Sequence, residues 1–359
     1  MALIPVTILT GFLGSGKTTL LKHILTAQHG KKIAVIENEF GEENIDSDIL
    51  VQDSQEQIVQ MSNGCVCCTI RGDLVVALNQ LWEERKQKKI QFDRVVIETT
   101  GVANPGPVAQ TFFMDDDVAN HYALDAVVTL VDAKHGQQQL NEHEEAQRQV
   151  GFADRIFITK TDLVDPLTVE TLRSRLVHMN PRAPIKGITK GVVPLEEVLD
   201  LKGFNLNAKL DIDPHFLEQE DHDHSDCGHD HSHDHDHDHD HAHCDDPSHH
   251  HNHHDHHGHT DRIQSFVFKS DYPFDHRKLE DFLGGILSVF GEKLLRYKGV
   301  LYVKGSKQKI VLQGVHEMMG SDMAGPWGAE QKQTRMVFIG VDLPKDTLLA
   351  GLEASLIKT

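Results

Sequence analysis

Cysteine is scarce in this sequence: the chain has 359 residues and only five cysteines. Three of the five stand close together within "GCVCC", Gly64 to Cys68. Neighbouring cysteines rarely reach the geometry of a disulfide, which needs Cα atoms roughly 5.5–6 Å apart. A structural disulfide network is therefore excluded for these three, and thiolates this close together suit a soft metal ion.

Long apolar runs and an excess of positive charge are also missing. No stretch of about 18 apolar residues occurs, so no transmembrane helix is expected. Asp and Glu number 55 against 35 Lys and Arg, and the net charge of −20 argues against nucleic acid as the main partner. The apolar start "MALIPVTILTGF" lacks the basic region and cleavage site of a signal peptide. We therefore expect a cytoplasmic protein that binds neither membranes nor nucleic acid.

Short runs rich in Val and Ile alternate with helical stretches up to about residue 200. The runs are "PVTIL", "KIAVIE", "DRVVIE", "DAVVTLVD" and "DRIFIT". Such runs are typical of buried parallel strands joined by helices, so the predicted fold class is α/β with a mainly parallel sheet. The stretch "TTLLKHILTAQHG" predicts the first helix, with Gly30 at its C-terminal cap. Its buried face should consist of Leu20, Leu21, Ile24 and Leu25.

Residues 221–259 have a different composition, with eighteen His, eleven Asp and no Lys, Arg or Glu. Because almost none of this stretch can be buried, we expect it to be disordered without a ligand. Beyond it, strand-like and helix-like stretches follow in the order strand–helix–strand–strand–strand–helix, which resembles a small ferredoxin-like α+β domain. The predicted divisions are a first domain at 1–205, a linker with the histidine tract at 206–261, and the α+β domain at 262–359.

The stretch "GFLGSGKT", Gly11 to Thr18, fits the P-loop pattern G-x-x-x-x-G-K-[ST], with a predicted strand before it and a helix after it. Its glycines let backbone N–H groups wrap a phosphate at the positive end of the helix. Lys17 can reach the β- and γ-phosphates, and Thr18 can coordinate Mg²⁺. The predicted nucleotide-binding residues of this loop are Gly11, Gly14, Ser15, Gly16, Lys17, Thr18 and Thr19.

A second motif, "FITKTD", ends an apolar run and resembles the N-K-x-D guanine motif of G proteins, with Thr159 in place of Asn. A carboxylate at Asp162 can accept both the N1–H and the N2–H₂ of guanine, a donor pair that adenine lacks. Lys160 can lay its apolar stem along the base. The motif therefore predicts GTP as the nucleotide.

A third motif, "VVIETTG", has Glu98 where P-loop GTPases often have the Asp of D-x-x-G, and it keeps the final glycine as Gly101. Gly101 can donate its N–H to the γ-phosphate, and Glu98 can bind Mg²⁺ through water or orient the attacking water. Together with Lys17 and Thr18, these are the predicted catalytic residues. The sequence shows no obvious water-positioning glutamine and no arginine finger, so slow intrinsic hydrolysis is expected.

In this order, the P-loop, E-N-E-F-G, C-x-C-C, E-x-x-G and T-K-x-D resemble the CobW-like family of P-loop GTPases. That family includes YjiA-type proteins and zinc-regulated GTPase metalloprotein activators, and it is related to the nickel-handling GTPases HypB and UreG. "YKGVLYV" and "GPWG" look like its second domain, so the resemblance covers the chain apart from the histidine tract. The resemblance implies a metallochaperone that hydrolyses GTP and couples its nucleotide state to delivery of a transition metal to a client metalloprotein.

The resemblance also implies a metal site, because in this family the C-x-C-C cysteines bind a transition metal, most often zinc, near the nucleotide switches. Carried onto this sequence, the candidates are Cys65, Cys67 and Cys68, with Glu37 or Glu42 close by. Zinc accepts thiolate and carboxylate ligands. Two ligand sets therefore stay open, one of three cysteines and one of two cysteines and a glutamate. We interpret the histidine tract as a zinc reservoir, since imidazole binds several transition metals. Its candidate ligands are His231, His233, His235, His237, His239 and His241.

Other functions stay open from the sequence alone. A metal buffer or storage protein on a GTPase scaffold predicts equal metal affinity with GTP and GDP. A second alternative is a GTPase that assists cobalt insertion in cobalamin biosynthesis, the process from which the CobW family takes its name. Against this alternative, the sequence of the second domain shows no recognisable pocket. An ATP-using P-loop kinase is disfavoured by Asp162. Zinc is preferred over Co²⁺ and Ni²⁺, while the client and a homo-oligomeric state are left open.

Overall fold

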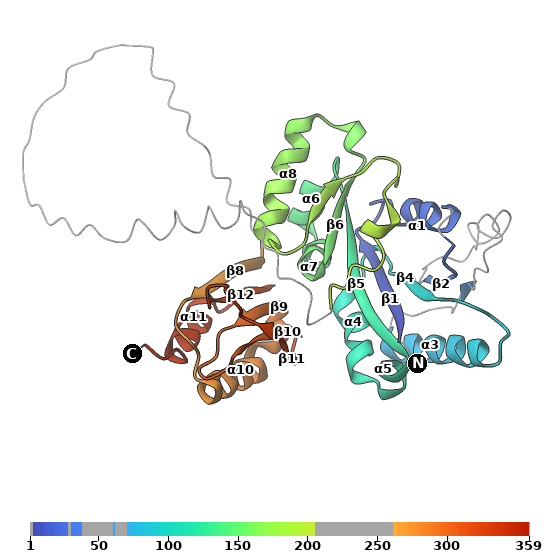
Figure 1. The fold of residues 1–359 in the computed structure, drawn as a ribbon. Helices are drawn as coiled ribbons and strands as arrows, with labels where there is room; N and C mark the ends of the chain where they lie inside the picture. Colours follow the sequence, from blue (N-terminus) through green and yellow to red (C-terminus); the bar gives the residue numbers. More distant parts are fainter. Residues whose placement is uncertain (1–2, 28–29, 38–59, 62–69, 205–260, 359) are drawn as a thin grey trace, which may run out of the picture.

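The computed structural model describes residues 3–27, 30–37, 60–61, 70–204 and 261–358, which form two packed units (Figure 1). The first unit contains a parallel sheet with helices on its faces, and the second contains an antiparallel sheet with two helices on one side. Within those ranges, no helix has the length and apolarity needed to cross a bilayer. The predicted combination of an α/β unit and a smaller α+β unit is therefore confirmed.

The sheet of the first unit has the strand order β3-β2-β4-β1-β5-β6-β7, and every pairing in it is parallel. The strands are β1 (Ile4–Gly11), β2 (Ile33–Glu37), β3 (Gln60–Met61), β4 (Arg94–Glu98), β5 (Tyr122–Asp132), β6 (Arg155–Thr159) and β7 (Ile185–Gly187). All five strands predicted from the sequence are present, whereas the short edge strands β3 and β7 carry no apolar run and were missed. Since the strands are parallel, all their carboxyl ends lie along one edge, where ligands bind in such sheets.

Helices cover both faces of this sheet. They are α1 (Lys17–Thr26), α3 (Ile70–Lys86), α4 (Pro105–Met114), α5 (Asp116–His121), α6 (Gly136–Glu142), α7 (Glu144–Phe152) and α8 (Pro166–Met179), with 3₁₀ turns η1 (Thr161–Leu163) and η2 (Leu195–Glu197). Side chains alternate between the faces of a strand, so Val6 and Ile8 join the core under α3, α4 and α7, while Leu9 joins the core under α1. The fold thereby fixes the sheet between two apolar layers.

Helix α1 confirms its predicted buried face and corrects its predicted end. The buried residues are Leu20, Leu21, Ile24 and Leu25, together with Lys17. The helix ends at Thr26 with Ala27 as its cap, and the left-handed Gly30 lies three residues farther on, so the prediction of Gly30 as the cap was wrong. The extended backbone of Ala27 already stops the helix before the glycine is reached.

The second unit has the strand order β11-β10-β9-β12-β8, all antiparallel. Its elements are β8 (Ile263–Ser270), α10 (His276–Phe290), η3 (Gly291–Lys293), β9 (Leu294–Leu301), β10 (Gln308–Val315), β11 (Met318–Pro326), β12 (Thr334–Val341) and α11 (Lys345–Ala354). Helices α10 and α11 cover one face, where Leu279 and Leu283 are buried. The edge strand β11 was not predicted, because "MMGSDMAGP" contains no β-branched residue and most of it is exposed.

The other face of the second sheet packs on the first unit. Ile263, Val315 and Ile339 belong to the same apolar core as Val150 and Phe152 of α7. The packing at α7 is tight, since a Cβ on Gly151 would lie 2.7 Å from a methyl carbon of Leu295. The two units are therefore joined by a continuous core.

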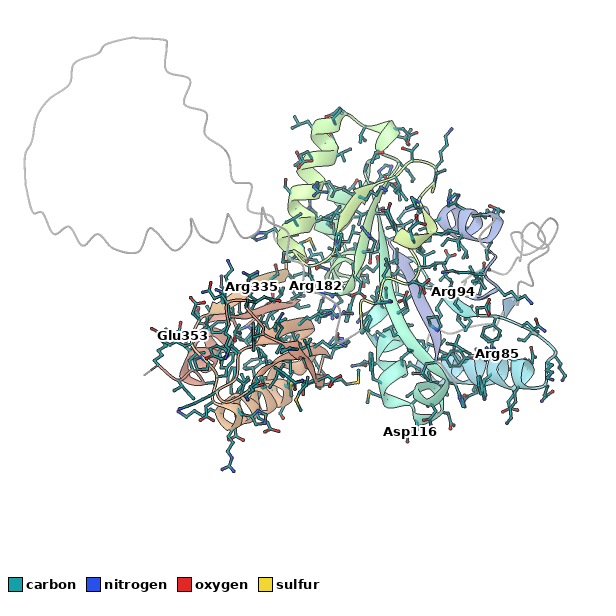
Figure 2. All side chains as sticks on the ribbon, in the orientation of Figure 1. Arg85, Arg94, Asp116, Arg182, Arg335 and Glu353 are labelled. Atoms are coloured by element: carbon teal, nitrogen blue, oxygen red, sulfur yellow. The ribbon has the colours of Figure 1, made fainter. Side chains whose placement is uncertain are left out.

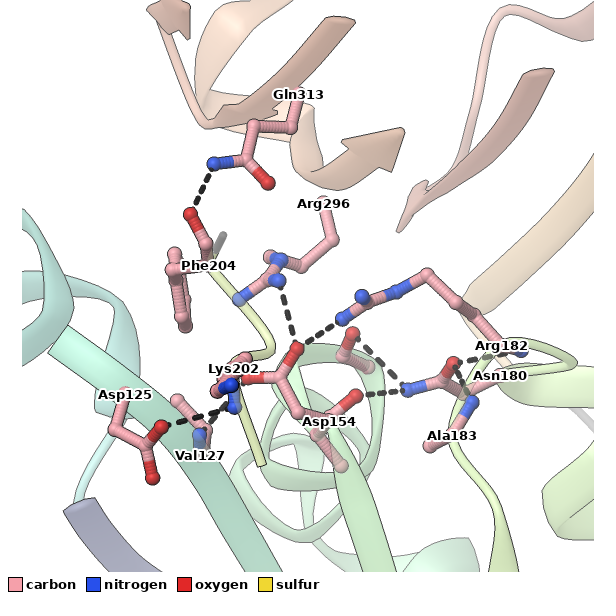
Figure 3. A network of polar contacts seen from close by, with 12 residues as sticks. Asp125, Val127, Asp154, Asn180, Arg182, Ala183, Lys202, Phe204, Arg296 and Gln313 are labelled. Atoms are coloured by element: carbon pink, nitrogen blue, oxygen red, sulfur yellow. Dashed lines mark hydrogen bonds and ion pairs between the residues drawn. The ribbon is translucent and has the colours of Figure 1, made fainter. Parts of the chain in front are cut away.

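A buried polar cluster crosses the same junction (Figure 3). Asp154 accepts hydrogen bonds from the backbone N–H of Val127 at 2.9 Å, from Nη2 of Arg296 at 2.8 Å, and from Arg182. Arg296 comes from β9, whereas Arg182 follows α8, and the label of Arg182 in Figure 2 marks this junction. One carboxylate thus links the end of α7, the segment after α8 and the second sheet.

Candidate functional site

The loop between β1 and α1 is built around glycine. Gly11 approaches β5 so closely that a Cβ there would lie 2.4 Å from the carbonyl oxygen of Leu130. Gly16 is the N-cap of α1 and has φ of +97°, a left-handed conformation in which a side chain is strained. The loop backbone therefore turns sharply over the N-terminus of α1, where the helix dipole favours an anion.

Lys17 folds back over this loop. Its Nζ donates to the carbonyl oxygens of Gly11 at 2.9 Å and Phe12 at 3.3 Å. Burial lowers the pKa of Lys17, and the charge of Glu98 acts in the opposite direction. The ammonium group thus lies inside the loop, and its hydrogen-bond acceptors among the described residues are neutral carbonyl oxygens, an arrangement that fits an incoming phosphate.

The Ser15 hydroxyl gives a second, independent sign of fit to phosphate. Its oxygen is buried and makes no hydrogen bond within the described part of the chain. A buried hydroxyl without a partner is unfavourable by about 1–3 kcal/mol, so a bound oxyanion would satisfy a group that the protein leaves open.

Thr18 and Glu98 meet at the carboxyl edge of the sheet. The hydroxyl of Thr18 donates to Oε1 of Glu98 at 3.3 Å. Hydroxyl and carboxylate oxygens are hard ligands of the kind that Mg²⁺ prefers, and Mg²⁺ usually binds few protein groups and keeps several waters. These two residues therefore fit a magnesium ion, which Thr18 and Glu98 would hold.

Glu37 ends strand β2 directly beside this pair. In the parallel ladder between β2 and β4, Glu37 is the register partner of Glu98. Residues paired in this way lie on the same face of a sheet, with backbones about 4.8 Å apart. The structure therefore places a predicted metal ligand next to a predicted nucleotide-site residue.

Gly101 lies against the P-loop. A Cβ at Gly101 would be 2.7 Å from the backbone nitrogen of Leu13, so only glycine fits this approach. Nε2 of Gln149, on α7, donates to the carbonyl oxygens of Gly101 at 3.1 Å and Ala103 at 3.0 Å. Gln149 was missed from the sequence, because it stands 48 residues from its partner and belongs to no motif.

The T-K-x-D motif is fastened to the P-loop at two points. The hydroxyl of Thr159 donates to the carbonyl oxygen of Ser15 at 2.7 Å. Nζ of Lys160 donates to the carbonyl oxygen of Gly14 at 2.7 Å and pairs with buried Asp132 at 2.6 Å. The hydrogen bonds of Thr159 and Lys160 thus join the T-K-x-D motif to the P-loop.

A loop that the sequence analysis missed contacts the residues predicted to recognise the base. Thr161, next to exposed Asp162, hydrogen-bonds the hydroxyl of Thr189 at 3.2 Å. Gly191, with φ of +71°, lies against α1, since a Cβ there would be 3.1 Å from the backbone of Thr19. The available signal was the glycine-flanked "GITKG" that follows β7 at the same sheet edge.

The predicted metal ligands are only partly described. Cys65, Cys67, Cys68 and Glu42 lie outside the described residues, as do all the predicted histidines, His231, His233, His235, His237, His239 and His241. Among the residues that the structure does describe, no three His, Cys, Asp or Glu side chains form a cluster that could hold a metal. Glu37 is therefore the one predicted metal ligand whose position is known.

The tie from Thr159 to the P-loop leads to a prediction. Thr159→Val keeps the shape of the side chain and removes its hydroxyl, and we expect GTP to bind about fivefold more weakly, or about 1 kcal/mol. Fluorescence titration with a labelled GTP analogue measures this. Thr171→Val is the matched control, because Thr171 is exposed and its hydroxyl donates to the carbonyl oxygen of Leu167 within α8. Equal affinity in both variants would contradict the role of Thr159.

Both units of the chain match known protein families. Residues 5–186 match the family described as CobW/HypB/UreG, nucleotide-binding domain, and residues 263–356 match the cobalamin synthesis protein cobW C-terminal domain. The chain is 40% identical to the zinc chaperone YjiA of Escherichia coli (strain K12) over 97% of each protein. It is 30% identical to the zinc-regulated GTPase metalloprotein activator 1 of Dictyostelium discoideum, over 96% of this chain and 72% of that protein.

A solved structure shows the same architecture. The crystal structure of Zn(II)-bound YjiA GTPase from E. coli superimposes with a TM-score of 0.73 at 35% sequence identity. The match covers 99% of this chain and 100% of that one, so it includes both units.

Proposed function

The chain belongs to the CobW/HypB/UreG family, and from that premise we propose that it is a GTPase that carries zinc and delivers it to a client metalloprotein. The observation that supports this proposal is the register pairing of Glu37 with Glu98, by which a predicted metal ligand and a predicted nucleotide-site residue are neighbours in the sheet. Its relatives are named as a zinc chaperone and a zinc-regulated GTPase metalloprotein activator. No described residue pattern favours a different cargo.

For GTP hydrolysis, we assign the phosphates to the P-loop and to Lys17, whose ammonium already lies within the loop. Mg²⁺ held at Thr18 and Glu98 would neutralise charge on the β- and γ-phosphates. Gly101 would donate its backbone N–H to the γ-phosphate, since it packs on Leu13 of the same loop. Positioning and electrostatic stabilisation are the main contributions that proteins make to phosphoryl transfer.

For guanine recognition, we assign Asp162 as the acceptor of the N1–H and N2–H₂ groups. The support is its place in the motif: Thr159 and Lys160 both bond to the P-loop, so Asp162 follows two fixed residues. Its neighbour Thr161 hydrogen-bonds Thr189 of the loop after β7. A carboxylate left unpaired by adenine would discriminate against ATP.

For zinc, we assign Cys65, Cys67 and Cys68 as the cargo ligands, with Glu37 or Glu42 completing the site. Glu37 and Glu98 are neighbours in the ladder. If the groups bound to Glu98 change when the γ-phosphate is lost, the position of Glu37, and with it the zinc affinity, would change as well. By linkage, zinc would then alter nucleotide affinity by the same factor. The histidines of 221–259 would supply zinc from nearby along the chain.

The predicted divisions are kept as part of this proposal: a GTPase domain at 1–205, a metal-binding linker at 206–261 and a C-terminal domain at 262–359. The two family matches, at residues 5–186 and 263–356, fall inside the first and third divisions. The GTPase domain would hold the nucleotide and the cargo, and the linker would hold reserve metal.

A zinc titration tests the proposal. In a chain lacking 221–259, zinc is titrated against a chelating indicator in the presence of Mg²⁺ and either GDP or a non-hydrolysable GTP analogue. We expect the two affinities to differ at least tenfold, which corresponds to about 1.4 kcal/mol of coupling. Glu37→Gln should reduce the difference, whereas Glu83→Gln, which changes an exposed side chain of α3, should leave it unchanged.

Two controls make the result decisive. Cys67→Ala in the shortened chain should remove tight zinc binding, and the melting temperature of the shortened chain should match that of the full chain. Identical zinc affinities with GDP and with the analogue would contradict the proposal. The protein would then be better described as a metal buffer on a GTPase scaffold.

A further inference from the structure

A cavity of about 550 Å³ lies at the junction of the two units, away from the nucleotide site. Phe113 of α4, Phe204, Val315 and Met318 form apolar parts of its wall, and Arg296 and Gln313 are its polar side chains. The volume falls in the range typical of small-molecule sites, which are mostly apolar with a few placed polar groups. This pocket could not be predicted from the sequence, because its walls come from α4, from Phe204 and from three strands of the second sheet.

The two polar side chains of this cavity have unused hydrogen-bonding atoms. Nη2 of Arg296 donates to Asp154, but Nη1 is buried and has no partner among the described residues. Nε2 of Gln313 donates to the carbonyl oxygen of Phe204 at 2.5 Å, while its Oε1 is likewise buried and unpartnered. Figure 3 shows both side chains reaching from the second sheet toward Phe204. Such groups are unfavourable when buried without a partner.

The charges around Arg296 do not balance. Arg296 and Arg182 both bond to Asp154, and neither guanidinium contacts a second carboxylate in the described structure. Burial lowers the pKa of Arg296 to about 9, Asp154 opposes the shift, and Arg182 adds to it. One carboxylate between two guanidinium ions leaves one positive charge in excess beside an apolar cavity, which favours an anion there.

We propose that this cavity binds a small molecule that carries one carboxylate on an apolar body. The carboxylate would complete the charge of the Arg296 cluster, and the apolar body would fill the space between Phe113, Phe204 and Met318. This goes beyond zinc delivery, since no P-loop, T-K-x-D or predicted metal residue lines the cavity.

Gly320 provides a variant that fills the cavity without touching the charged cluster. It pairs with Gln313 in the ladder of β10 and β11, so a side chain at Gly320 would lie on the same face as Gln313. A Cβ there would meet no atom within 4 Å, so Gly320→Leu is expected to fold. Gly325→Leu is the matched control, because Gly325 lies on the same strand, has equal space and does not line the cavity.

The test is calorimetric titration of the full chain with sodium octanoate, and with octanamide as its uncharged analogue. We expect saturable one-to-one binding of octanoate and at least tenfold weaker binding of octanamide, or about 1.4 kcal/mol. Gly320→Leu should weaken octanoate binding at least tenfold, whereas Gly325→Leu should bind it as the unaltered chain does. Thermal melting of both variants confirms that they are folded.

Three results would overturn the proposal. These are the absence of saturable octanoate binding to the unaltered chain, equal binding of octanoate and octanamide, and full binding by folded Gly320→Leu. The titration needs no nucleotide or zinc, so its failure would leave the proposed GTPase and zinc functions untouched.

Discussion

Replacing Lys17 by alanine is expected to reduce GTP hydrolysis by about 10²–10³-fold or more, since removing one donor to a developing oxyanion has effects of this size. Lys17 is the only cation within hydrogen-bonding distance of the P-loop carbonyls of Gly11 and Phe12 in the described structure. Its burial makes the ammonium group more effective, because charges interact more strongly away from bulk water. Phosphate release under saturating GTP and Mg²⁺ measures the loss.

The control for this prediction is another lysine of the same helix. Lys22→Ala removes an ammonium from α1 that makes no hydrogen bond or ion pair to the loop in the described structure, and it should leave turnover unchanged. Zinc binding by the histidine tract, measured by competition with a chelating indicator, should also survive Lys17→Ala, since the tract at 221–259 does not include the P-loop. Turnover that is equal in the two variants would show that this loop does not hold the transferred phosphate.

The fold of the first unit could be predicted because its signals are local. A buried parallel strand is a short apolar run, and a P-loop is a contiguous motif, so β1, β4 and the loop at Gly11 were all recognisable. Local signals are weak at edges, where strands are short or exposed. Strands β3, β7 and β11 were missed for this reason.

The arrangement of the site depended on contacts that the sequence does not show. Gln149 reaches Gly101, and Thr161 reaches Thr189, across separations of 48 and 28 residues. The order of strands in the sheet determines which of these residues meet. That order could not be predicted from one sequence. The predicted catalytic and guanine residues nevertheless converge on one sheet edge, as parallel strands require.

The register of Glu37 beside Glu98 is the clearest gain from the structure. The sequence placed Glu37 at the end of one strand and Glu98 at the end of another, 61 positions later, without showing that β2 and β4 are neighbours. Because the two strands are adjacent, the proposed coupling between metal binding and nucleotide state has a physical route through Glu37 and Glu98. That route can be tested by Glu37→Gln, which leaves the P-loop intact.

Asp154→Asn is expected to lower the free energy of unfolding by about 3–5 kcal/mol, the effect typical of breaking a buried ion pair by removing one partner. The variant leaves Arg182 and Arg296 buried with two positive charges and no carboxylate between them. Urea denaturation at pH 7 measures the change. Asp342→Asn is the control, because its partner Arg262 is half exposed and the pair is solvated, so little stability should be lost.

The pH dependence of this effect identifies its cause. Burial by itself raises the pKa of Asp154, but Arg296, Arg182 and the N–H of Val127 outweigh it and hold the pKa below its ordinary value. A lowered pKa means that the stabilisation is complete above the unfolded-state pKa of about 3.9 and is lost as the pH falls through the folded-state value. The difference in unfolding free energy between the unaltered chain and Asp154→Asn should therefore be constant from about pH 5 to 8 and should shrink below about pH 4. A difference that stayed the same down to pH 3 would mean that packing at the junction, and not the ionised carboxylate, holds the two units together.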